Sequence, residues 1–247
     1  MSIRLPRIAG VLLATGLLFG TATPAFAEDA RSDDDATEET HGLRDRCDRA
    51  IDRRLTDLAN AQNRVAGVEV LTDAHAATIN GIIDSTEAGL AAHAVELAEA
   101  NDRVEIVQLC TEIATNFRVY LVVLPQTHLT VGADRVDAAV ARGDALVAAF
   151  DEAVEAAIEA GADVTDAVTS RDAAVAHLDA AAATVAGVAD EVLTVTPASY
   201  NDGPGQTTIA DTRAAVRSAH GELKDGIADG QLAIRKLREA LDAVGED

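Results

Sequence analysis

Positive charge is scarce in this sequence. Its 247 residues include 20 lysines and arginines against 42 aspartates and glutamates, which gives a formal net charge of −22. A surface this acidic repels nucleic-acid phosphates and anionic lipid headgroups, so the composition excludes a nucleic-acid-binding protein and a charge-held peripheral membrane protein. We interpret the charge as a solubility feature rather than as an acidic binding site.

Motifs for catalysis and metal binding are also missing. The chain lacks Gly-x-Ser-x-Gly, Ser-x-x-Lys and glycine-rich phosphate loops. No two histidines lie one helical turn apart, the spacing that a metal site on a helix needs. Glu38 and His41 fit a Glu-x-x-His pattern, but they lie in an acidic segment and are interpreted as a coincidence. We therefore expect no enzyme, no cofactor and no metal. The six histidines are His41, His75, His93, His128, His177 and His220.

The first 27 residues are typical of a secretory signal peptide. Arg4 and Arg7 precede an apolar stretch over residues 8–19, and small residues lead to Ala25-Phe26-Ala27. The apolar stretch is shorter than the about 20 residues that span a bilayer, so cleavage is favoured over anchoring. No later stretch looks long and apolar enough to span a membrane. The sequence predicts a secreted, extracytoplasmic protein without stable membrane insertion.

Only two cysteines occur, Cys47 and Cys110. Two thiols at this spacing offer no zinc ligand set, whereas in an exported protein they suggest one disulfide. Each cysteine falls on a helical stripe of apolar residues that should pack inward. The sequence favours a Cys47–Cys110 bridge, and two buried free thiols are the alternative.

After the signal peptide, residues 28–41 form an acidic segment. Residues 28–40 hold seven acids and no large apolar side chain, so this tail should be disordered. These acids lack the ligand order and central glycine of an EF-hand, which argues against calcium. From residue 42 to residue 247 the apolar spacing is helical almost throughout. We expect one elongated helical bundle over residues 42–247.

The spacing predicts a first helix over residues 43–65 and a second over residues 73–100, with Thr72 or Asp73 as its cap. Asp102 and Glu105 resemble a capping box that opens a third helix. Apolar residues spaced alternately four and three then run over 136–161 and 164–192, as in a coiled-coil hairpin, with Asp163 as a cap between them. Thr196-Pro197 should open a short helical turn, and Thr208 with Asp211 should cap a last helix. The predicted fold is an all-α, elongated antiparallel helical bundle.

Large side chains gather in residues 103–135, around the apolar run Val119–Leu124. Pro125 removes a hydrogen bond and clashes with the preceding turn, so a kink or short break is expected there. A strand over Val119–Leu124 is the alternative, but no alternating partner strand is present. The run is expected to be core, with Leu121 buried. A partly exposed binding surface is the other interpretation.

Several short stretches resemble one group of proteins. These are Arg46-Cys47, Phe117 to Pro125, His128-Leu129 and Ala133-Asp134-Arg135. They are similar to exported, Ala-rich helical proteins of high-GC Gram-positive bacteria. The resemblance implies a helical fold and an exported location, and it carries over no catalytic or binding residue.

The favoured function is a non-enzymatic secreted or cell-envelope binding or scaffold protein, because long helical faces and negative charge occur without a reactive group of residues. Its partner would be an envelope or extracellular protein. The alternative is a helical toxin-like or lipid-interacting protein that uses Val119–Leu124 as a concealed apolar element.

Overall fold

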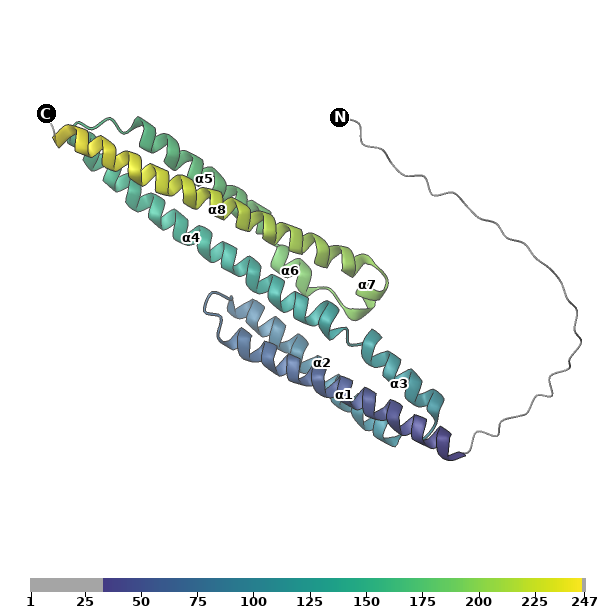
Figure 1. Ribbon diagram of the computed structural model, residues 1–247. Helices are drawn as coiled ribbons and strands as arrows, with labels where there is room; N and C mark the ends of the chain where they lie inside the picture. Colours follow the sequence, from purple (N-terminus) through teal and green to yellow (C-terminus); the bar gives the residue numbers. More distant parts are fainter. Residues whose placement is uncertain (1–32, 246–247) are drawn as a thin grey trace, which may run out of the picture.

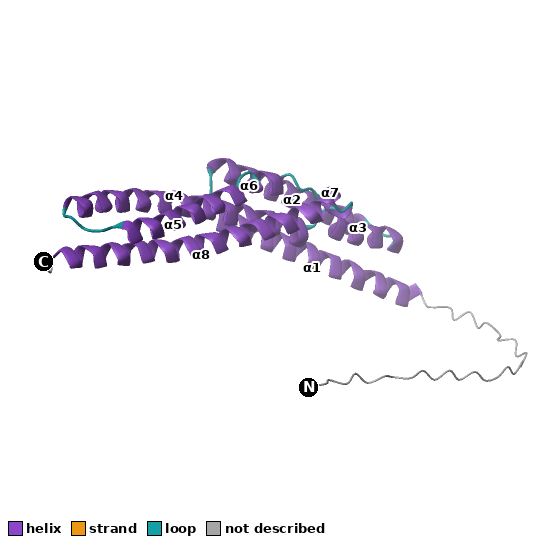
Figure 2. Ribbon diagram, turned by 90° about the horizontal axis from the view of Figure 1, so that it is seen from above, coloured by secondary structure: helices purple, strands orange, loops and turns teal. Residues whose placement is uncertain are grey.

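The structure is a computed structural model that describes the backbone of residues 33–245. The predicted signal peptide therefore lies outside the described residues. Within 33–245 every regular element is a helix and no strand occurs, so the all-α prediction is confirmed and the strand alternative for Val119–Leu124 is wrong (Figure 2). The elements are α1 (Asp33–Ala66), α2 (Asp73–Glu99), α3 (Arg103–Thr115), η1 (Val119–Val123), α4 (Leu124–Glu159), α5 (Thr165–Val185), α6 (Val188–Leu193), α7 (Pro197–Asn201) and α8 (Pro204–Gly245).

The helices form two layers, each built from consecutive elements (Figure 1). In the first layer α1, α2 and α3 pack around the largest apolar cluster, which includes Ile51, Ile83 and Ile106. In the second layer α4, α5 and α8 lie side by side, and Leu178 and Leu237 fill their contacts. The N-terminal part of α4 joins the layers, because Val131 packs into the first cluster and Val136 into the second.

Helix ends in the first layer follow the predicted caps. The Thr72 hydroxyl accepts a hydrogen bond from the His75 N–H at the start of α2, and Asp102 accepts one from the Val104 N–H at the start of α3. The N-terminus of α1 differs from the prediction, because the helix begins at Asp33. Residues 33–41 of the predicted disordered tail are therefore helical.

Cys47 of α1 and Cys110 of α3 form a disulfide, with their Cα atoms 5.6 Å apart. This is the pairing expected from the two inward stripes. Cys47 is buried, and Cys110 is partly buried against the same apolar cluster. The bridge links α1 to α3 within the first layer.

The break in the central stretch lies before Pro125 rather than at it. Helix α3 ends at Thr115, and Arg118 then takes a left-handed backbone with φ of 41°. Residues Val119–Val123 form a π-helical turn in which the Leu124 N–H bonds to the Val119 carbonyl. Pro125 follows in the first turn of α4, where its missing N–H costs little. A kink or break was expected at Pro125, and the irregularity in the structure is the π-helical turn Val119–Val123 just before it.

In the second layer α4 and α8 run in the same direction and α5 runs against them (Figure 1). The two seams predicted from alternating spacing are buried only in part, and the second is interrupted. Helix α5 ends at Val185, and Gly187 takes a φ of 72° before α6. The apolar spacing continues into α6, so the predicted helix over 164–192 did not include this break.

The connection to α8 is partly as predicted. Thr196 and Ser199 form a capping box that opens α7. The last helix begins at Pro204, however, so Thr208 and Asp211 lie inside it and do not cap it. Proline in the first turn, where the N–H has no helical partner, sets this start.

We expected no stretch after the signal peptide to be long and apolar enough to cross a membrane. Judged by length and composition alone, one stretch meets both conditions, so this expectation is wrong. Residues 103–159, which join α3, η1 and α4, contain one window apolar enough to do so. In the folded protein 33% of that window is buried.

Candidate functional site at the α1–η1 surface and the buried polar junction

The π-helical turn places its apolar residues on two sides. Val119, Val122 and Val123 are buried, whereas Tyr120 is 45% exposed and Leu121 is 43% exposed. The prediction that the whole run is core, with Leu121 inside, is therefore wrong for these two residues. A π turn rotates side chains relative to an α-helix, and such turns occur frequently at functional sites.

The left-handed Arg118 is held in place by α7. Its guanidinium Nε donates to the Asn201 Oδ1 at 2.7 Å and lies over the Tyr200 ring, 5.6 Å from its centroid. Asn201 in turn donates to the Thr115 carbonyl at the end of α3. A non-glycine residue in this region costs about 1–3 kcal/mol, which persists only where neighbours fix it. The contacts with α7 supply that support and preset the position of η1.

Tyr120 contacts α1 through both its hydroxyl and its ring. The hydroxyl donates to the Asp57 Oδ2 at 2.9 Å, and the Arg54 guanidinium lies 5.3 Å from the ring centroid. Burial raises the pKa of Tyr120, the bond to Asp57 raises it further, and the charges of Arg54 and Arg53 act against both. The phenol therefore stays protonated and keeps donating to Asp57.

A shallow polar pocket of about 440 Å³ continues this surface along α1. Its lining is Asp57, Asn60, Asn63 and Arg64. The Arg64 charge also acts on His128 of α4. Burial lowers the pKa of the His128 imidazole, and the Arg64 charge lowers it further. We call Arg54, Asp57, Arg64, Tyr120 and Leu121 the α1–η1 patch. It presents two cations, one acid, an aromatic ring and an aliphatic side chain in a chain of net charge −22.

A second polar group lies inside, between the layers. Asp134 of α4 is 3% exposed, and its carboxylate contacts the His75 Nδ1 of α2 at 2.8 Å. It also accepts from the Thr72 backbone N–H at 2.9 Å, and the His75 Nε2 lies 3.3 Å from Asp190 of α6. Two turns earlier on α4, the buried Gln126 donates to the Val192 and Val195 carbonyls at 2.8 Å. These bonds connect three helices at what we call the polar junction.

Charges at the polar junction act on His75 and Asp137. Burial lowers the His75 pKa, but hydrogen bonds and charges from Asp134 and Asp190 outweigh it and the net direction is upward. Burial raises the Asp137 pKa, the Asp134 charge raises it further, and His75 lowers it. Both nitrogens of His75 face carboxylates, so neither is directed at a nucleophile. This geometry suits a residue that holds α2 against α4 and α6, rather than a general base.

Stability should depend on pH through His75. Because its folded pKa is raised above 6.5, the stabilisation is fully present below about pH 6.5 and is lost as the pH rises through the folded pKa. The measurement is the difference in unfolding free energy between the wild type and His75→Gln across this range. His177, whose pKa the bond to Glu222 raises, and His128 titrate in both proteins and cancel in the difference. A pH-independent difference would contradict the assignment.

The other candidate sites show less evidence of a function. Among the described residues no group of three or more histidines, cysteines or acids is placed to hold a metal ion. The buried His93 bonds the Leu109 carbonyl at 3.0 Å and stacks edge-on against Phe117, which gives it a role in packing α2 against α3.

The polar junction was not predicted from the sequence, nor were three of the five residues of the α1–η1 patch, Arg54, Asp57 and Arg64. His75 and Asp134 are 59 residues apart, so no local spacing links them. A usable signal was present on α4, where Gln126, Thr130 and Asp134 follow each other at intervals of four, just after the apolar run Val119–Leu124. Such spacing places polar side chains on one helix face and indicates a polar contact between helices.

Comparison with known proteins adds no relative. No family model, curated protein or solved structure matches this chain. The assignment of function therefore rests on the geometry of the α1–η1 patch and the polar junction.

Proposed function

We propose that this chain is a non-enzymatic secreted or cell-envelope binding or scaffold protein, and that the α1–η1 patch holds its protein partner. The proposal includes cleavage after residue 27 and an elongated antiparallel helical bundle as the scaffold. The carrying observation is the pair of backbone irregularities at Arg118 and η1, which hold Tyr120 and Leu121 at the surface although large side chains are scarce in this chain.

The residue types of the patch support protein recognition. Tyrosine and arginine are enriched among residues that dominate binding energy, and both are present with their positions fixed by contacts. The Asp57 bond orients the Tyr120 ring, and Arg54 stacks on it. A preset surface loses little side-chain freedom on binding, which favours affinity. Carboxylates of a partner could pair with Arg64 and Arg54 where this otherwise acidic protein offers cations.

Leu121→Ala tests the patch directly. Because Leu121 is 43% exposed, we expect its loss to lower the unfolding free energy by less than about 1 kcal/mol, well short of the 2–5 kcal/mol of a buried leucine. Capture of an envelope-extract partner should fall about tenfold, more so in Tyr120→Ala with Leu121→Ala. Thermal melts and quantitative pull-downs measure the two effects.

The matched control is Val104→Ala, because Val104 is 73% exposed on α3, away from the patch. This variant should bind like the wild type. A large loss of stability in Leu121→Ala, or equal loss of capture in Val104→Ala, would overturn the assignment of the patch.

A lipid-interacting protein is the second candidate. It is favoured by the apolar window within residues 103–159 and by the 43% exposure of Leu121, which lies in that range. Flotation with neutral and anionic liposomes separates the two functions. Co-flotation that Leu121→Asp abolishes would favour the lipid function, and the absence of flotation beside specific capture of a protein favours the first proposal.

A further inference from the structure

The C-terminal half of α8 has a regular seam of buried and half-buried residues. Residues spaced alternately four and three apart face α4 and α5, as in a coiled coil. Most of them are small, so the backbones approach closely, and a Cβ at Gly226 would lie 3.1 Å from the His177 Cβ. The seam consists of Ala219, Leu223, Gly226, Gly230, Ala233, Leu237 and Ala240.

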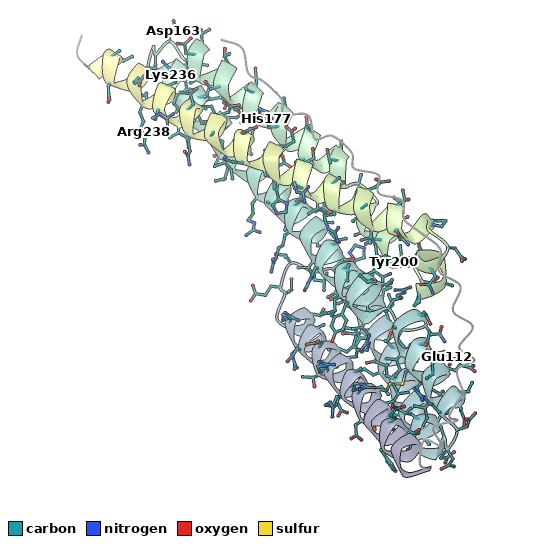
Figure 3. The ribbon with its side chains drawn as sticks, turned by 45° about the vertical axis from the view of Figure 1, so that its right-hand side comes forward. Glu112, Asp163, His177, Tyr200, Lys236 and Arg238 are labelled. Atoms are coloured by element: carbon teal, nitrogen blue, oxygen red, sulfur yellow. A yellow bond between two sulfur atoms is a disulfide. The ribbon has the colours of Figure 1, made fainter. Side chains whose placement is uncertain are left out.

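Polar contacts show which flank of this seam faces α5. Glu222 and Asp229 lie 2.8 Å and 3.5 Å from the nitrogens of His177 on α5, and Lys236 lies 3.9 Å from Asp166. These three α8 residues are seven apart and occupy one flank. Figure 3 shows Lys236 on the side of α8 nearer α5 and Arg238 on the opposite side.

The other flank of α8 carries large apolar side chains that nothing covers. Ile227, Ile234 and Leu241 also lie seven apart, and they are 60%, 46% and 41% exposed. Apolar residues at a fixed heptad position beside a seam are typical of a helix that contacts one more neighbour.

Helix α4 presents a matching flank. Asp151 forms an ion pair with Arg171 of α5, with 3.4 Å between the Asp151 Oδ1 and the Arg171 Nε, which assigns one flank to α5. The opposite flank carries Leu146, which is 71% exposed, followed by the exposed Ala149, Ala153 and Ala156. It adjoins α8, because a Cβ at Gly132, two heptads before Leu146, would lie 3.0 Å from Val216 of α8.

The two flanks therefore form one surface, away from α5. We call it the α4–α8 face, made of Leu146, Ala149, Ala153, Ala156, Ile227, Ile234 and Leu241.

Cations border this face, although the protein as a whole is acidic. Arg142 of α4 and Lys224 and Arg238 of α8 border it, with Gln231 between the last two. No acid occupies the heptad positions that make up the face and its border over these parts of α4 and α8, although the chain has 42 acids. The strip is thus bordered by one cation on α4 and two on α8, and a partner with carboxylates beside its own apolar strip is complementary to these cations.

Three partners are conceivable for such a strip, and the observations favour one. Two copies of the face would oppose their arginines and lysines, which disfavours a symmetric dimer. An anionic membrane would meet a protein of net charge −22. A helix fits both the straight heptad spacing and the row of alanines, which permits close approach.

We propose that the α4–α8 face binds an acidic amphipathic helix of another protein, which completes a four-helix bundle with α4, α5 and α8. This interaction surface is separate from the α1–η1 patch and does not depend on it.

The test uses a fluorescent synthetic helix about three heptads long, with leucines on its seam and glutamates on its flanks. It should bind the full chain with 1:1 stoichiometry, and rising salt should weaken it. Ile234→Glu should reduce affinity about tenfold or more, as should Leu146→Glu, because each places a carboxylate in the apolar strip. The same substitution at the exposed Val104 is the control and should leave binding unchanged, as should Leu121→Ala in the α1–η1 patch.

Each alternative has its own result. Failure of the acidic helix to bind, or equal binding of a helix with lysine flanks, would overturn the proposal. Sedimentation velocity that shows a dimer abolished by Ile234→Glu would replace it with self-association. Flotation on anionic vesicles that Ile234→Glu abolishes would replace it with lipid binding. Unchanged circular dichroism of all variants shows that lost binding does not reflect lost folding.

Discussion

Replacing His75 with alanine is expected to lower the free energy of unfolding by about 3–5 kcal/mol. The substitution leaves the Asp134 carboxylate, with its side chain 2% exposed, with the Thr72 N–H as its only remaining hydrogen-bond donor in the polar junction. Breaking one partner of a buried ion pair costs this much because the other charge is left in a poorly solvated place. The contact between α2 and α4 should loosen, since His75 and Asp134 are the main polar link between the layers.

A double-mutant cycle separates the pair from its members. Asp134→Ala alone removes the buried charge and should cost less than His75→Ala, and the double variant should be more stable than the sum of the single effects predicts. Chemical denaturation at pH 6 to 7 gives all four values. His220→Ala on the surface of α8 is the control, with little expected change. Additive effects would show that His75 and Asp134 do not act together.

Loss of the disulfide should have an effect of similar size. Cys47→Ser with Cys110→Ser is expected to lower the unfolding free energy by about 2–5 kcal/mol, because the bridge restricts a loop with a sequence separation of 63 in the unfolded chain. The midpoint of thermal unfolding should fall in the double variant. Adding reductant should lower the midpoint of the wild type to nearly the same value.

Peptide mapping without reductant provides the independent check on this bridge. A Cys47–Cys110 cross-linked peptide is the expected result. If the double variant melted with the wild type, or if both thiols reacted with alkylating agents in the folded protein, the bridge would not be part of the native structure.

The sequence predicted what depends on local spacing and little of what depends on distant partners. The apolar spacing identified the helices, and Thr72 and Asp102 marked two of the helix starts, because caps act within one turn. The inward stripes were enough to pair Cys47 with Cys110. The prediction was wrong where a break has no strong local signal, as at Arg118, or where an apolar pattern runs through a glycine, as at Gly187.

The candidate site was harder to predict for a physical reason. Whether Leu121 is inside or outside depends on the rotation that the π turn imposes, and that turn depends on contacts of Arg118 with α7, more than 80 residues away. Ile227 and Ile234 are large apolar residues, a type usually found inside a protein, yet both are exposed on α8. The buried seam of α8 lies one residue away from them and uses alanine and glycine, which a search for large apolar residues passes over.

The order of the layers along the chain sets the order in which the protein can be completed during synthesis. The first layer is buried almost wholly by residues up to Val123, so its helices can pack before α8 exists. A chain that stops after α5 would hold a finished first layer beside an uncovered strip that includes Ala174, Leu178 and Ala181. Such an intermediate would associate with other chains through this exposed apolar strip. Packing of the 42-residue α8 covers the strip and is therefore the step that prevents this association.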